Sequence, residues 1–276
     1  MLKSDCSKLM DNAEQQAKEG QNEDAVDLFL RAAECWNRWE SFGKAAEAYE
    51  RGYEHAMLCN LYSQAANLMR KAAQLWVREG EHEKFEIDFQ IAAEAFVYAA
   101  EEEKDPNRFV DGAFCAILGG DIELARQLIH AAAETTQGKM KELINLALML
   151  SEYHYGDAEM YIEAAITRVL DKEGIRNIKE IFELAFDGFV RALLESETAV
   201  TVHSIAESTD MNLIKITRLV ERGIERGQIP AYLDRDSLEL IIDSERVDMD
   251  ALSRRKGPIL SRDLEDPGAW DMELED

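Results

Sequence analysis

The chain has 276 residues, of which 46% are hydrophobic, and this is enough apolar material for one large domain or two modest ones. The formal net charge of −25 disfavours binding to nucleic acid or anionic lipid, unless a local patch overrides the mean, and favours basic protein partners or simple solubility. No apolar run approaches the roughly 18 residues of a membrane helix, and the N-terminus is too polar for a signal peptide. We therefore expect a soluble, cytoplasmic protein with no integral membrane association.

The cysteines form no CxxC pair and no obvious disulfide framework; they are Cys6, Cys35, Cys59 and Cys115. Three of them lie within apolar helical patterns. We interpret them as small core residues in a reducing compartment.

A repeat of twenty residues runs through the first third of the chain. Segments 22–36, 42–56, 62–76 and 82–96 start at equal intervals, and their apolar positions follow i, i+4, i+7, i+8 and i+11, which is one face of an α-helix. Small residues recur at the centre of this face, as in Ala32, Gly52, Ala72 and Ala92. Fainter copies include Gly112 and Ala132. The small residues predict places where neighbouring helices approach closely, with Trp36 and Trp76 filling the wider gaps at the helix ends.

One helix in each period implies hairpins of about 40 residues that stack, because a single hairpin cannot bury its own apolar face. The pattern is punctuated by Gly20, Gly43, Gly80, Gly119, Gly120, Gly156 and Gly174. With these breaks, the predicted helices are 3–19, 22–39, 41–59, 61–79, 81–103, 107–118, 121–135, 138–154, 157–172 and 175–196. Together they predict an arc with a concave inner surface.

The phrases Ala25-x3-Phe29-x2-Ala32 and Ala45-x3-Tyr49-x2-Gly52 resemble the second-helix signature of tetratricopeptide repeats. The longer hairpins, with AVDLFLRAAECW and GKAAEAYERG, are similar over residues 14–170 to the soluble NSF attachment proteins (SNAPs). Those proteins are all-helical adaptors that recruit an AAA ATPase to SNARE bundles. The resemblance implies a mainly α fold, a right-handed α-solenoid of antiparallel helix hairpins, over residues 1–197.

After Ser196 the pattern changes to two short helices and a hairpin. Residues 202–206 form a helix face, Thr209-Asp210 a turn, and 216–224 the apolar face of a second helix that stops at Gly227. Two strands follow at 228–233 and 238–242. This order predicts a small α+β winged helix over 198–243.

The phrase IAE…ITRLVERGIERGQIPAYLD resembles the end of a PCI domain, the module of proteasome-lid, COP9-signalosome and initiation-factor-three subunits. In that family the winged helix mostly mediates subunit assembly. The resemblance implies a scaffold and not a catalyst.

Four cations fall on one stripe of the second short helix, beside its apolar face: Lys215, Arg218, Arg222 and Arg226. Three interpretations remain open: a solvated surface, a protein-binding stripe, or a nucleic-acid contact. Four phosphate contacts would give a salt slope of about −3.6, which is weak binding for so acidic a chain.

Residues 244–276 have the composition of a disordered acidic tail, in which basic residues at 254–256 come before the acidic end 262–276. Trp270, Met272 and Leu274 alternate with acidic residues. They indicate either a merely solvated tail or a docking motif that folds on a partner.

Motifs for catalysis or cofactor binding are missing: the sequence has no GxxxxGK[ST], no GxGxxG after a strand, no GxSxG and no HExxH. Glu81-His82-Glu83 could ligate a metal, but a polar helix start explains it better. We therefore expect no enzyme, cofactor or metal, and predict a non-catalytic scaffold or adaptor, a PCI-type subunit of a multiprotein complex. The alternatives are a SNAP-like adaptor for an AAA ATPase in membrane trafficking and a winged-helix nucleic-acid-binding regulator.

Overall fold

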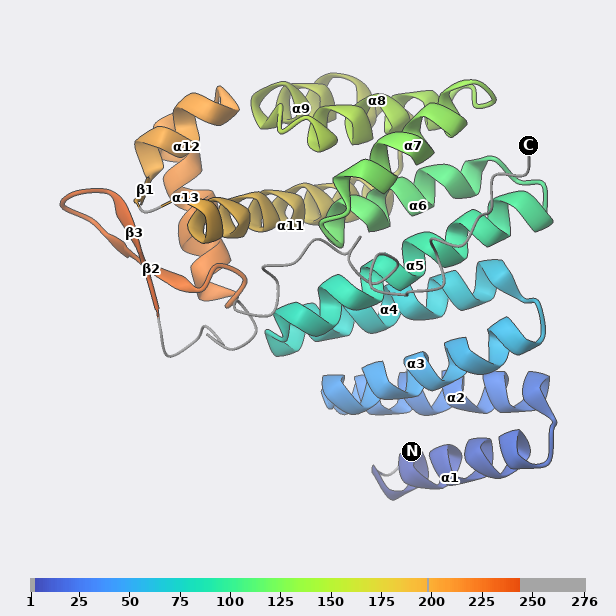
Figure 1. Ribbon diagram of the computed structural model, residues 1–276. Helices are drawn as coiled ribbons and strands as arrows, with labels where there is room; N and C mark the ends of the chain where they lie inside the picture. The colour runs from blue at the N-terminus through green and yellow to red at the C-terminus, as the bar shows by residue number, and fades with distance from the viewer. Residues whose placement is uncertain (1–2, 198, 244–276) are drawn as a thin grey trace, which may run out of the picture.

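The computed structural model describes residues 3–197 and 199–243, which are mainly helical with a small three-stranded sheet near the C-terminal end. The first helices are α1 (Lys3–Lys18), α2 (Asn22–Arg38), α3 (Phe42–Leu58), α4 (Tyr62–Glu79), α5 (His82–Glu102), α6 (Asn107–Leu118), α7 (Ile122–Ala133) and α8 (Lys139–Ser151). Each of them packs on the next along the chain. Figure 1 shows α1 to α6 as successive layers. The predicted boundaries of these helices agree to within about three residues.

Small residues of the repeat lie where successive helices touch. A Cβ atom added to Gly52 of α3 would lie 3.4 Å from Phe29 Cβ of α2 and 3.4 Å from Leu68 Cδ1 of α4. The repeat alanines are fully buried: Ala25, Ala32, Ala33, Ala45, Ala56, Ala65, Ala72, Ala73, Ala92 and Ala93. The prediction that these positions mark close helix contacts is confirmed.

A polar cluster lies inside this stack, around a tryptophan of the repeat. Trp76 of α4 is buried, and its Nε1 donates a hydrogen bond to Glu50 Oε1 of α3 at 2.6 Å. The Lys84 ammonium lies 4.0 Å from the centroid of the same indole. Asp88 of α5 is buried nearby, and burial, followed by the charge of Glu50, raises its pKa to about 8. The end-filling tryptophan therefore also donates a hydrogen bond to a half-buried carboxylate, that of Glu50.

The predicted helix 157–172 is interrupted. It is resolved into α9 (Tyr155–Tyr161), a π-helical turn η1 (Ile162–Ile166) and the short α10 (Thr167–Val169). The next helix, α11 (Lys172–Ser196), starts earlier than predicted, because the Asp171 carboxylate caps it by accepting a hydrogen bond from Gly174 N at 2.8 Å. Gly174 therefore lies in the first turn of α11 and is not a break between helices.

The remaining elements, residues 199–243, are called the C-terminal unit below. They are β1 (Val200–Thr201), α12 (Val202–Thr209), α13 (Leu213–Glu225), β2 (Ala231–Asp234) and β3 (Glu239–Ile242). Both strand pairs are antiparallel and the sheet order is β1-β3-β2. The two predicted helices and two predicted strands are present, with β2 shifted toward the turn. The strand β1 was not predicted, since two residues show no alternation.

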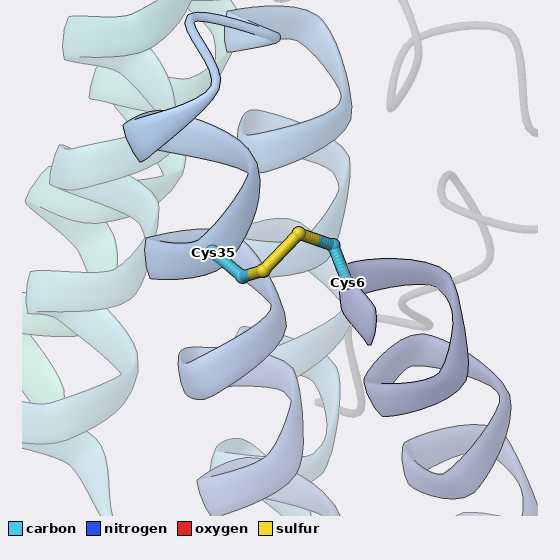
Figure 2. Close-up of a disulfide and its surroundings, with 2 residues drawn as sticks. All are labelled: Cys6 and Cys35. Carbon is cyan, nitrogen blue, oxygen red and sulfur yellow. A yellow bond between two sulfur atoms is a disulfide. The ribbon is translucent and has the colours of Figure 1, made fainter. Parts of the chain in front are cut away.

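One prediction about the cysteines is wrong. Cys6 of α1 and Cys35 of α2 form a disulfide (Figure 2), although both are buried as expected. The two residues lie 29 positions apart, and they meet only because α1 and α2 pack against each other. Cys59 and Cys115 are free thiols, half-buried and buried respectively. The pair does not fit the expectation of four reduced core cysteines in a reducing compartment.

Within residues 3–197 and 199–243, no helix combines the length and apolar character needed to cross a membrane. The predicted tail, 244–276, with its candidate docking residues Trp270, Met272 and Leu274, lies outside the described residues.

Candidate functional site

The cationic stripe of α13 faces two other helices, α9 and α11. Lys215 Nζ lies 2.8 Å from Glu159 Oε2 of α9. Arg222 Nη1 lies 2.6 Å from Glu183 Oε1 of α11. The stripe, which the helical spacing predicted, is therefore partly used in ion pairs that join α13 to the helices before it.

The last cation of the stripe is held more deeply. Arg226 pairs with Glu183, and its Nη2 donates to Asp187 Oδ2 at 2.8 Å. Asp187 is fully buried; burial raises its pKa to about 6, although Arg226 acts in the opposite direction. Gly223 of α13 provides the space for this carboxylate, because a Cβ there would lie 2.5 Å from Asp187 Oδ1. This pair fixes the distance between α11 and α13.

A pocket of about 230 Å³ opens between α9, η1, α11 and α13. Three of the four predicted cations line it: Lys215, Arg218 and Arg222. The apolar part of its wall comes from Ile162, Phe182 and Leu219. Four cations and three glutamates line the pocket in total, so one positive charge is in excess.

Arg218 carries this excess charge. Lys179 pairs with Glu163 at 2.7 Å, and the two ion pairs above use Lys215 and Arg222. Arg218 is exposed, and no carboxylate of the described residues lies within ion-pair distance of it. The pocket therefore combines an available guanidinium with an apolar wall.

The chemistry of the lining suits binding. A guanidinium beside apolar side chains can hold a carboxylate or phosphate whose neighbouring group is apolar. The three glutamates of the pocket are each paired with a cation of the lining. Glu163 and Ile162 come from the π-helical turn η1, and single π turns inside helices frequently occur at functional sites.

A second polar cluster joins the C-terminal unit to the helical layers, and sequence reasoning missed it. Arg191 of α11 is buried, and it donates from Nη1 to Gln228 O at 2.9 Å and from Nη2 to Glu86 Oε1 at 2.9 Å. Gln228 is buried too, and its Nε2 donates to Val77 O of α4 at 2.9 Å. An arginine inside the apolar face of α11 was the signal that could have indicated this cluster.

The start of α5 contributes His82 to the same cluster. Burial and the nearby Arg191 charge lower the pKa of His82 to about 4. The imidazole is therefore neutral at neutral pH. Within the described residues, no group of three or more potential metal ligands is found, so Glu81-His82-Glu83 does not come together with further ligands.

The other end of the C-terminal unit also contacts the helices closely. Gly156 in the first turn of α9 lies against the chain at the end of α12, and a Cβ there would lie 2.7 Å from Asp210 O and 3.0 Å from Thr209 O. The C-terminal unit is thus held at α9, along α11, and at the junction of α4 and α5.

Comparison with models of known protein families and with curated proteins gave no match to this chain.

Proposed function

We propose that this protein is a non-catalytic scaffold or adaptor that holds a partner protein within a multiprotein complex. In this proposal the layered helices are a right-handed solenoid of tetratricopeptide or SNAP-like hairpins, and the C-terminal unit is a PCI-like winged helix. The order α12, α13, β2, β3 and the resemblance of 205–234 support the second assignment.

The observation that carries the proposal is the attachment of the C-terminal unit through Arg191 and Gln228. These buried hydrogen bonds reach α4, α5 and α11 together. Buried hydrogen bonds between elements restrict their relative orientation. A partner would therefore meet one continuous surface, which is what a scaffold offers.

The pocket beside α13 is the proposed attachment point for an acidic residue of that partner. Arg218 provides the charge, and the apolar wall receives a neighbouring side chain. The nucleic-acid alternative loses support here, because Lys215, Arg222 and Arg226 are engaged with carboxylates. A gel shift at low salt that shows DNA or RNA binding would restore it.

The experiment is affinity purification of the tagged full chain from its source cells after cross-linking, with mass spectrometry of the recovered proteins. Arg218→Glu should lower recovery of the main partner about fivefold or more, because it replaces the available cation by an anion. Arg176→Glu, which changes an exposed arginine in the second turn of α11, is the matched control and should not lower this recovery. A full chain that recovers no stable partner contradicts the scaffold proposal. If Arg218→Glu recovers as much partner as the wild type, only the assignment of the pocket as the attachment point is contradicted.

The SNAP-like alternative predicts stimulation of an AAA ATPase, and an ATPase assay with the purified chain distinguishes it. A cytoplasmic location stays a prediction. The Cys6–Cys35 disulfide counts against a strongly reducing compartment.

A further inference from the structure

A group of tyrosines on α3, α4 and α5 lies apart from the pocket in sequence and in the elements that form it. It consists of Tyr53, Tyr62 and Tyr98, called the tyrosine patch below. The rings of Tyr62 and Tyr98 are stacked, with centroids 5.9 Å apart and planes 26° apart. Tyr98 is 51% exposed, and Tyr53 and Tyr62 are half-buried.

The helix α5 continues this patch along its exposed side. Ile87 lies 11 residues before Tyr98, which is close to three helical turns, so the two share one stripe of α5. Ile87 is 53% exposed. Aromatic side chains are enriched at protein interfaces and at their energetic centres. Tyr98 leaves half of its surface exposed, and an exposed aromatic ring on the same stripe as exposed Ile87 and Glu94 indicates a contact with another molecule.

Two carboxylates lie beside the tyrosines. Glu94 comes four residues before Tyr98 on α5, so the two side chains are neighbours on one face of the helix, and Glu54 follows Tyr53 on α3. Burial raises the pKa of the Tyr53 hydroxyl, and the charge of Glu94 raises it further. Glu94 is exposed, and no cation within the described ranges lies at ion-pair distance from it. Glu54 pairs with Arg51 at 3.3 Å, but both side chains are more than half exposed, so the pair is weak and exchangeable.

We propose that the tyrosine patch binds an arginine-rich segment of a partner protein, and this inference rests on the proposed scaffold function. A guanidinium can stack on the exposed Tyr98 ring while it donates hydrogen bonds to Glu94. An acidic segment would be repelled by the carboxylates. A purely apolar segment would bury Glu94 without a partner, which is unfavourable. The net charge of −25 adds long-range attraction for a basic segment.

The test uses the full chain and an acetylated, amidated hexa-arginine peptide, with the dissociation constant measured by calorimetry at about 0.15 M salt. Tyr98→Ser should weaken binding about fivefold, as expected for loss of one cation–π contact. Tyr232→Ser is the matched control, because Tyr232 of β2 is 53% exposed, and it should change the dissociation constant less than twofold. Circular dichroism should be unchanged in both variants, since both side chains are exposed.

The charge component has its own pair of variants. Glu94→Gln should weaken binding about threefold and reduce its dependence on salt. Glu207→Gln, at an exposed glutamate of α12, should do neither. Hexa-lysine should bind more weakly than hexa-arginine, because an ammonium does not stack on the ring as a guanidinium does.

Equal loss of affinity in Tyr98→Ser and Tyr232→Ser, or no loss in either, overturns the inference and leaves only general charge attraction. Tighter peptide binding after Arg254→Ser and Arg255→Ser would identify the chain's own basic segment as the occupant and would overturn the assignment to a partner. Arg218→Glu should not alter peptide binding. Failure of the peptide assay is therefore distinguishable from failure of the partner recovery that tests the scaffold itself.

Discussion

Replacement of Gly52 by leucine should destabilise the protein by about 2 kcal/mol. Gly52 lies in the middle of α3, where the ideal Cβ position is already 3.4 Å from Phe29 of α2 and 3.4 Å from Leu68 of α4. Overpacking a core costs about 1–3 kcal/mol, and the upper value applies here because helices on two sides must move. Replacing a glycine in a helix interior stabilises the helix by about 1 kcal/mol. The overpacking cost less this gain leaves a net destabilisation of about 2 kcal/mol.

Urea denaturation measures this difference, with Gly52→Ala as the paired control. A single Cβ at 3.4 Å is ordinary contact, so Gly52→Ala should stabilise by about 0.5–1 kcal/mol through helix propensity alone. Gly188→Ala in α11, with its nearest neighbour at 3.6 Å, should behave similarly. The slopes of the transitions should agree if all variants unfold in the same way. If Gly52→Leu lies within about 0.5 kcal/mol of Gly52→Ala, α3 is not packed closely on both sides and the reasoning is refuted.

Three further predictions follow from buried groups. Cys6→Ser with Cys35→Ser should lower stability by about 3–4 kcal/mol in urea, the chain-entropy expectation for a separation of 29 residues; four reactive thiols in the unreduced, denatured wild type would contradict the disulfide. Arg191→Met should lower stability by about 3–5 kcal/mol in thermal unfolding, because it removes the donor to the Gln228 carbonyl and the ion pair with Glu86; a loss under about 1 kcal/mol would show that this contact is not formed. The folded-state pKa of Asp88 is raised to about 8, so the stability that protonated Asp88 contributes to folding is fully present below about pH 4 and is lost as pH rises toward 8. Across that range the free energy of unfolding of Asp88→Asn should therefore rise relative to that of the wild type, by an amount of the order of a few kcal/mol. Parallel curves of unfolding free energy against pH for the two proteins would contradict this.

Much of the helical layer could be predicted because its signals are local. The twenty-residue repeat placed Ala72 and Gly52 at helix contacts from spacing alone, and the boundaries of α1 to α8 followed. Glycine punctuation was less reliable. Gly43 and Gly156 lie inside helices and do not end them. A Cβ atom at Gly43 would lie 3.3 Å from the Trp76 ring, and one at Gly156 would lie 2.7 Å from the Asp210 carbonyl oxygen, so close packing explains these glycines.

Several turns instead use residues that no local rule would have chosen. Glu40, Lys104 and Tyr153 all have positive φ at the ends of helices. Left-handed backbone is uncommon for such side chains, and for a bulky residue such as Tyr153 in particular. Packing of the flanking helices determines these turns, and packing is not visible in a local sequence window.

The sequence predicted the cations of the candidate site but not the carboxylates that pair with them. Helical spacing grouped Lys215, Arg218 and Arg222 on α13, but their surroundings come from residues such as Glu159 and Glu183, many positions away. The same holds for the disulfide, which joins two helices without any motif. Contacts of this kind depend on how elements pack, so the residues next to each partner in the sequence do not indicate them.

The most direct test of the scaffold account is quantitative recovery of partner proteins by the full chain from its source cells. Three proteins are compared: the wild type, a double variant that combines Arg218→Glu with Tyr98→Ser, and a double control that combines Arg176→Glu with Tyr232→Ser. The account predicts one or more protein partners recovered in near-stoichiometric amount by the wild type and by the control, and at least fivefold less by the double variant. Recovery of no stoichiometric partner by the wild type would contradict the account.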